Sequence, residues 1–125
     1  MRVIRIYADA TGTSHLEELR IALAPDRLGR ISQPMAAGEG AFLRELRAGM
    51  FNDFHCAPRR QLVIVIDGDL SVEAGDGARA VARRGEAYFV EDTSGRGHVT
   101  RAGDTPVLCA YIPVAPQFDI RTICG

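Results

Sequence analysis

The stretch DFHCAPRRQLVIVIDGDL (residues 53–70) places a histidine, a cysteine and a glutamine directly ahead of an unbroken apolar run. The run QLVIVI shows no polar alternation, which predicts a strand that is buried on both faces. Gly68, in the sequence DGD, predicts a tight turn at the end of this strand. Alternate residues of a strand share a face, so Gln61 and Val65 are expected to point together into the interior. His55 has the same parity, which predicts polar side chains at the mouth of a buried pocket.

Short segments with period-2 alternation and glycine-rich turns follow one another along most of the chain, which favours an all-β sandwich or barrel. The segment LEELRIAL and the segment AFLREL also fit a helical stripe, but their strand-rich surroundings favour strands. The tail from residue 116 is expected to form an edge strand or an ordered arm. The expected strands are 2–8, 16–23, a short one within 26–34, 41–47, 61–66, 70–74, 78–83, 87–91, 98–102 and 107–114.

Composition restricts the class of protein. A chain of 125 residues has room for one domain. Its net charge of −1 provides no basic field for nucleic acid. No segment approaches the ~20 apolar residues that span a bilayer, and the start lacks the apolar core of a signal peptide. Three cysteines without CxxC spacing indicate neither a disulfide framework nor a zinc knuckle. We therefore expect a cytoplasmic protein that binds neither nucleic acid nor membrane.

Two spaced motifs carry a resemblance to a known superfamily. In the first, His55-Cys-Ala57 is followed by three residues, then Gln61, then six residues and Gly68. This spacing resembles the first motif of the cupins, small jelly-roll barrels, which runs His-x-His, three or four residues, Glu, six residues, Gly. The second histidine of that motif is replaced here by Ala57, and the glutamate by Gln61.

The second motif begins at Gly85, which is followed by five residues and then EDTSGRGH. Glu91 stands in the place of the cupin proline and His98 in that of the cupin histidine, with two extra residues between them. HCAPRRQ and VEDTSGRGH also resemble a bacterial branch of small single-domain cupins. The resemblance covers residues 50–114 well and residues 1–50 loosely. It implies an all-β cupin jelly-roll (double-stranded β-helix) fold in a single domain, residues 1–125.

The resemblance also implies a divalent transition metal (Fe, Mn, Ni or Zn), which cupins hold with three histidines and one glutamate. The residues in those places are His55, Gln61 and His98. An amide oxygen is a weak neutral ligand, so this set would hold a metal less tightly. Glu91 or Asp92 could restore a carboxylate, and His15 an imidazole.

A metal-free pocket uses the same residues differently. His55 and His98 would then be the acid–base groups, because imidazole titrates near neutrality. Glu91 or Asp92 would orient an imidazole, but adjacent strand residues point opposite ways, so only one of them can face the pocket. Substrate contacts would come from Gln61, Asp92 and Arg59, although solvated charges at a strand end are the simpler interpretation of Arg59 and Arg60.

Two further residues have simpler interpretations. Surface exposure beside Glu17 and Glu18 explains His15 as well as a site role does. Cys56 has the wrong parity to share the pocket of His55, so we interpret it as a packing residue rather than an activated thiolate.

The sequence favours a small-molecule-binding protein, an enzyme that acts on a small polar metabolite by isomerase, lyase or dioxygenase chemistry. A non-catalytic ligand-binding or sensing module that has lost the metal site is the alternative, and a structural partner in a larger complex is a third. Because QLVIVI is apolar on both sides, an N-terminal strand or a second subunit is expected to cover its outer face. The simplest such cover is a homodimer interface.

Overall fold

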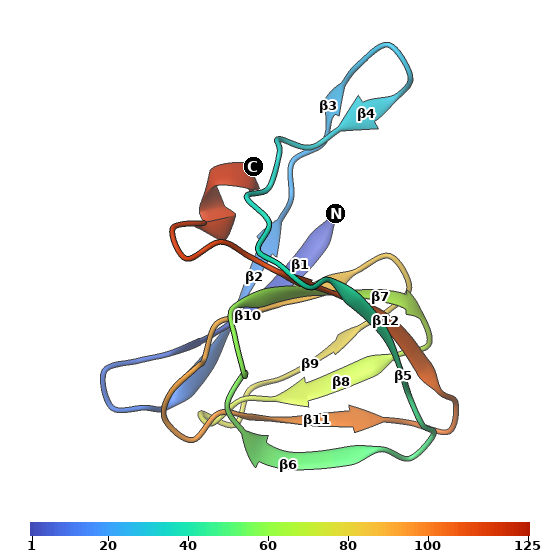
Figure 1. Ribbon diagram of the computed structural model, residues 1–125. Helices are drawn as coiled ribbons and strands as arrows, with labels where there is room; N and C mark the ends of the chain where they lie inside the picture. Colours follow the sequence, from blue (N-terminus) through green and yellow to red (C-terminus); the bar gives the residue numbers. More distant parts are fainter.

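The computed structural model describes residues 1–125 and consists of β-strands with one short 3-10 helix. Six strands form a larger sheet in the order β2-β1-β10-β7-β12-β5, and four form a smaller sheet in the order β6-β11-β8-β9 (Figure 1). Strands β3 and β4 form a separate hairpin that projects away from both sheets. The elements are β1 (Arg2–Ala8), β2 (Ser14–Arg20), β3 (Ala24–Pro25), β4 (Arg30–Ile31), β5 (Phe42–Leu46), β6 (Phe51–His55), β7 (Gln61–Asp67), β8 (Leu70–Glu73), β9 (Arg79–Ala82), β10 (Ala87–Val90), β11 (His98–Ala102), β12 (Val107–Pro113) and η1 (Ile120–Ile123).

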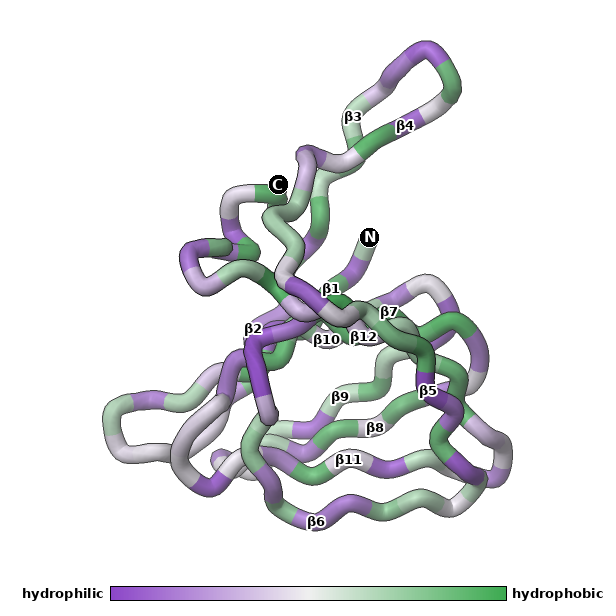
Figure 2. Tube along the Cα trace, in the orientation of Figure 1, coloured by the Kyte–Doolittle hydropathy of each residue, from purple (hydrophilic) through white to green (hydrophobic).

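The two sheets share one apolar core between them, to which β1, β7, β10 and β12 contribute from one side and β8, β9 and β11 from the other. Along the smaller sheet, hydrophilic and hydrophobic residues alternate (Figure 2), as expected where one face is solvated. Neither sheet closes into a barrel. The structure therefore confirms the predicted all-β class and has the form of two packed open sheets.

Strand β7 lies in the interior of the larger sheet and pairs antiparallel with both β10 and β12. Val63 and Val65 belong to the core between the sheets, whereas Leu62 lies in a second apolar cluster on the outer face. Gln61 is also buried, with 3% of its surface exposed. The predicted burial on both faces is confirmed from Gln61 to Val65, with Val63 and Val65 on the inner face, whereas Ile66 is 40% exposed.

The outer face of the larger sheet is covered by the chain's own C-terminal arm, residues 114–125. Phe118, Ile120 and Ile123 are buried in the outer cluster with Leu62 and Phe89. The rings of Phe118 and Phe89 meet edge to face with centroids 5.9 Å apart. The sequence predicted an N-terminal strand or a second subunit as the cover of this face. Within the chain the C-terminal arm covers it, and Val3 and Ile21, near the N-terminus, belong to the same apolar cluster.

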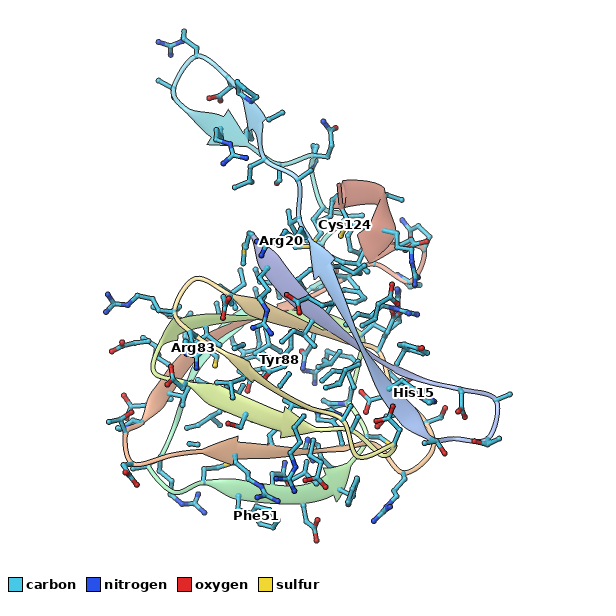
Figure 3. All side chains as sticks on the ribbon, turned by 180° about the vertical axis from the view of Figure 1, so that it is seen from behind. His15, Arg20, Phe51, Arg83, Tyr88 and Cys124 are labelled. Carbon is cyan, nitrogen blue, oxygen red and sulfur yellow. The ribbon has the colours of Figure 1, made fainter.

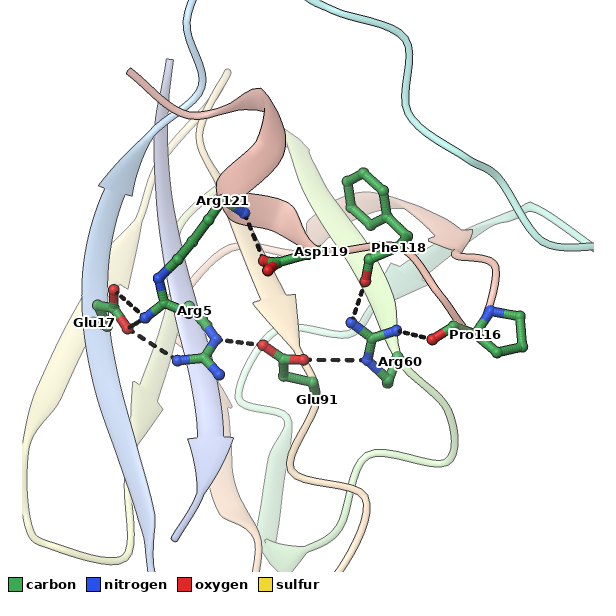
Figure 4. A network of polar contacts seen from close by, with 8 residues as sticks. All are labelled: Arg5, Glu17, Arg60, Glu91, Pro116, Phe118, Asp119 and Arg121. Atoms are coloured by element: carbon green, nitrogen blue, oxygen red, sulfur yellow. Dashed lines mark hydrogen bonds and ion pairs between the residues drawn. The ribbon is translucent and has the colours of Figure 1, made fainter.

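Polar contacts fix the arm to the sheet (Figure 4). The Arg60 guanidinium donates to the carbonyl oxygens of Pro116 at 3.1 Å and Phe118 at 2.5 Å. Arg121 donates to both carboxylate oxygens of Glu17, at 2.7 and 2.6 Å. The Arg60 bonds satisfy two backbone carbonyl groups of the arm, and the Arg121 pair joins the arm to β2.

Most expected strands are present, and two ambiguous segments form β2 and β5. Strand β6 was not expected, because FNDFH has no period-2 pattern. In the structure most of its residues are exposed. The tail forms an ordered arm with a 3-10 turn, Ile120–Ile123, rather than an edge strand. That turn is the only helix, and it is too short to cross a bilayer.

We expect Phe118→Ala to lower the free energy of unfolding by about 3–5 kcal/mol, because it opens a cavity against Phe89 under the arm. Urea denaturation at 25 °C measures this change. Phe51→Ala is the matched control, since Phe51 is 53% exposed, and it should cost less than about 1 kcal/mol. Equal losses in the two variants would show that the arm does not seal the sheet.

Candidate functional site

A cavity of about 430 Å³ lies between the two sheets. Residues of β5, β6, β7 and β11 supply most of its polar wall, and core residues of both sheets supply its apolar wall. The cavity is lined by Ile6, Phe42, Arg44, Leu46, Met50, Asn52, His55, Ala57, Pro58, Arg59, Gln61, Val63, Leu70, Val72, Tyr88, Val90, His98, Thr100 and Tyr111.

The structure brings His55 and His98 together in this cavity. His55 ends β6, His98 begins β11, and the two residues stand directly opposite each other in the antiparallel pairing of these strands. Their ring centroids are 4.6 Å apart, with the ring planes tilted by 53°. His98 is 3% exposed, whereas His55 is half-buried. A ligand in the cavity can therefore contact both imidazoles.

Each imidazole is oriented through its Nδ1 atom. Nδ1 of His55 donates to the carbonyl oxygen of Asp53 at 2.8 Å, and Nδ1 of His98 donates to Oδ2 of Asp92 at 2.5 Å. A carbonyl or carboxylate accepts, so Nδ1 is the donor of each ring, and Nε2 is the ring nitrogen that has no protein partner. Asp92 is fully buried, and its Oδ1 has no hydrogen-bond partner.

The meeting of the two histidines depends on Gly97. Its φ is +81°, and a Cβ atom at this position would lie 1.9 Å from the carbonyl oxygen of His55. The Gly97 carbonyl accepts a hydrogen bond from the buried hydroxyl of Ser14 at 2.7 Å, which in turn accepts from the Gly75 amide at 2.7 Å. Only a residue without a side chain permits this approach.

Gln61 and Arg59 occupy the same end of the cavity. Arg59 Nη1 lies 3.3 Å from Oε1 of Gln61, which leaves the Gln61 amide nitrogen without a protein partner. Ala57, in the place of the second cupin histidine, also lines the cavity and is 4% exposed.

Of the two adjacent acids, only Asp92 reaches a histidine. Its carboxylate lies behind the His98 ring and does not itself line the cavity. Glu91 projects to the opposite side, where it accepts hydrogen bonds from Arg5 and, at 3.1 Å, from Arg60 (Figure 4). The structure therefore does not bring Glu91, expected as a catalytic group, to the histidines. Glu91 directly follows β10, which ends at Val90, and it continues the alternation of that strand, so it points away from the face of Val90 and Asp92.

His15 and Cys56 lie outside the cavity. His15, which is labelled in Figure 3, stands between Asp9 (2.6 Å from Nε2) and Asp76 (3.0 Å from Nδ1). The hydrogen bond to Asp9, with a smaller contribution from Asp76, raises the pKa of the His15 imidazole. The Cys56 thiol donates to the Gly95 carbonyl at 2.9 Å, consistent with a packing role. Another free cysteine, Cys109, is fully buried, and burial raises the pKa of its thiol to about 11.

The sequence did not single out three residues of the cavity wall: Phe42, Arg44 and Tyr111. The rings of Phe42 and Tyr111 stack with centroids 4.8 Å apart and planes 7° apart. Burial raises the pKa of the Tyr111 phenol. The alternation of Phe42, Arg44 and Leu46 in β5 was the available signal, because it places these side chains on one face.

The donor set does not fit the transition metal that the resemblance implies. His55, His98 and the Gln61 amide are the candidate ligands, and Ala57 supplies none. No three His, Cys, Asp or Glu side chains lie together as a metal-binding group. One oxygen of Asp92 is taken by His98, behind the ring. Two imidazoles and a neutral amide lack the further histidine and carboxylate of a cupin site, and no step proposed below uses a metal.

The sequence matches no protein-family model and no curated protein. The functional argument therefore depends on the geometry of the cavity.

We expect Gly97→Ala to destabilise the protein much more than Gly77→Ala. Both glycines have a positive φ, +81° and +89°, but a Cβ at Gly77 meets open space. The Gly77 variant should therefore cost only the conformational strain of about 1–2 kcal/mol, and the Gly97 variant should cost more because β6 and β11 must separate. Thermal and urea unfolding measure both changes. Equal losses would contradict a tight approach at His55.

The raised pKa of His15 should be visible in an NMR titration of its ring. Because the folded pKa is raised, the contact stabilises the fold fully below about pH 6.5, the ordinary value, and is lost as the pH rises through the folded pKa. The same contact lowers the pKa of Asp9, so its contribution there is lost as the pH falls below about 4. Asp9→Asn should return the His15 pKa toward its ordinary value, and Asp76→Asn should move it less. A larger effect of Asp76→Asn would contradict this assignment.

Proposed function

We propose that the chain is a small-molecule-binding cupin of the jelly-roll (double-stranded β-helix) type, and an enzyme that transfers protons on a small polar metabolite. The observation that carries the proposal is the pair of imidazoles, 4.6 Å apart, whose Nδ1 atoms are engaged while both rings line a cavity of about 430 Å³. The spaced motifs around His55 and His98 support the cupin assignment, and so does the packing of two sheets around the cavity.

In this proposal, His98 is the general base. Its Nε2 lone pair accepts a proton from the ligand, while Asp92 holds the ring through Nδ1 as the carboxylate does in a catalytic triad. His55, on the neighbouring strand β6 of the same sheet, binds or returns a proton at a second atom of the ligand. Gln61 and Arg59 position the ligand through the amide and the guanidinium. Isomerisation and elimination are the reaction classes that two such groups serve.

A non-catalytic ligand-binding or sensing module is the second candidate. It is favoured by Ala57 and Gln61, which stand where a cupin has a histidine and a glutamate, because both substitutions remove metal-binding chemistry while keeping the cavity. Location in the cytoplasm and a homodimer stay predictions. The apolar face that motivated the dimer is covered within the chain.

The proposal is tested by screening a library of organic acids, amides, amines and sugars against ¹⁵N-labelled protein. Binding in the cavity should shift the Nε2 resonances of His55 and His98. His98→Gln should weaken that binding tenfold or more, about 1.4 kcal/mol, because it removes the imidazole ring that the ligand contacts. His15→Gln is the matched control and should change nothing, since His15 lies outside the cavity. Binding should also persist in the presence of a chelator.

Two measurements separate the candidates. For each binder, NMR in D₂O reports exchange of ligand C–H protons or conversion to product, and Asp92→Asn should slow that reaction by a factor of ten or more with little effect on binding. Binding without exchange or turnover would favour the sensing module. Absence of any binder that shifts both histidines would refute the proposed function.

A further inference from the structure

The wall of the cavity has an uneven distribution of charge. None of its 19 lining residues is an aspartate or glutamate, whereas two are arginines, Arg44 and Arg59. Asp92, the acidic residue beside the histidine pair, lies behind His98 and is hydrogen-bonded to Nδ1 of His98. An anion in this cavity would therefore meet two guanidiniums and no opposing carboxylate.

The two guanidiniums are not neutralised by the protein. Neither Arg44 nor Arg59 has a carboxylate within 4.0 Å, in contrast to Arg5 and Arg60, which both pair with Glu91 on the other side of the sheet. The one polar side-chain contact of Arg59 is the 3.3 Å approach to Gln61. An unpaired guanidinium presents several N–H donors in a fork that matches a carboxylate.

Both guanidiniums gather at one aromatic wall. The Cζ atoms of Arg44 and Arg59 lie 5.6 and 6.0 Å from the centre of the same ring, Phe42. Arg44 also lies 5.4 Å from the centre of the Tyr111 ring, which stacks on Phe42. The remaining wall is largely apolar, with residues such as Leu46 and Val63. The cavity thus combines a cationic end with a flat apolar surface.

We propose that the ligand of this cavity is a small organic carboxylate with an apolar or aromatic body. Arg44 and Arg59 bind its carboxylate, and Phe42 and Tyr111 contact its body, while the histidine pair remains available to its other polar atoms. This inference rests on the proposed function, because it names the class of ligand that the same cavity takes.

The test compares benzoate with benzamide, which has nearly the same shape and no charge. We expect benzoate to bind at least tenfold more tightly, measured by NMR shifts of residues lining the cavity, and to weaken as NaCl rises from 0.05 to 0.5 M. The double variant Arg44→Gln/Arg59→Gln should abolish the preference for benzoate. Arg47→Gln, which removes a positive charge from an exposed position outside the cavity, should preserve it. Melting temperatures establish that each variant is folded.

The outcomes separate the two proposals. If benzamide binds as tightly as benzoate, or if only neutral members of the library bind, the carboxylate inference is overturned and the proposed function stands. Phenyl phosphate that binds where benzoate does not would overturn it in favour of a phosphate ligand. If no compound shifts the residues of the cavity, both proposals fail.

Discussion

The close contact between the backbone of Gly97 and the carbonyl of His55 is the constraint on which the candidate site depends. It sets β11 against β6 at the register that places His98 opposite His55. The Ser14 hydroxyl secures the same loop by bonding to the Gly97 carbonyl and the Gly75 amide. Four segments that are distant in the sequence therefore meet at one point. Their backbones place His98 opposite His55, and the bonds at Nδ1 then orient the two rings.

Strand alternation divides neighbouring residues between two tasks. Arg60 and Glu91 point to the outer face, where they secure the C-terminal arm, and Gln61 and Asp92, the next residues along, belong to the candidate site. The apolar residues of β7 divide in the same way between the two clusters. A single-residue shift in the register of β7 would exchange the residues of its two faces, so the cavity and the covered outer face require the same register.

The sequence predicted the all-β class, most strands and the inward face of β7, because these depend on local periodicity and turn chemistry. It also singled out His55 and His98, which lie in two segments that resemble known motifs, the second with two extra residues. Alternation showed that only one of Glu91 and Asp92 can face the histidines, but not which one, because that depends on where the strand ends. The cover of the outer face by Phe118 is a contact between distant segments, which no local pattern encodes. Alternation in β5 places Phe42 and Arg44 on one face but does not show that this face lines the cavity. The polar segment 51–55 became a strand through its pairing with β11, against weak local preference.

The pairing of β1 with β10 has a consequence for how the molecule assembles. These strands run parallel, and a hydrogen bond between Arg2 and Glu86 beside them spans 84 positions of the chain. Contacts of such separation carry the loop-closure entropy of most of the polypeptide, which slows folding. Strands β7 to β12 pair mostly with partners nearer in the sequence, whereas the N-terminal hairpin is held by long-range contacts, among them the bond from Ser14 to the Gly97 carbonyl. A nascent chain therefore exposes an unfinished cavity until nearly its whole length is available.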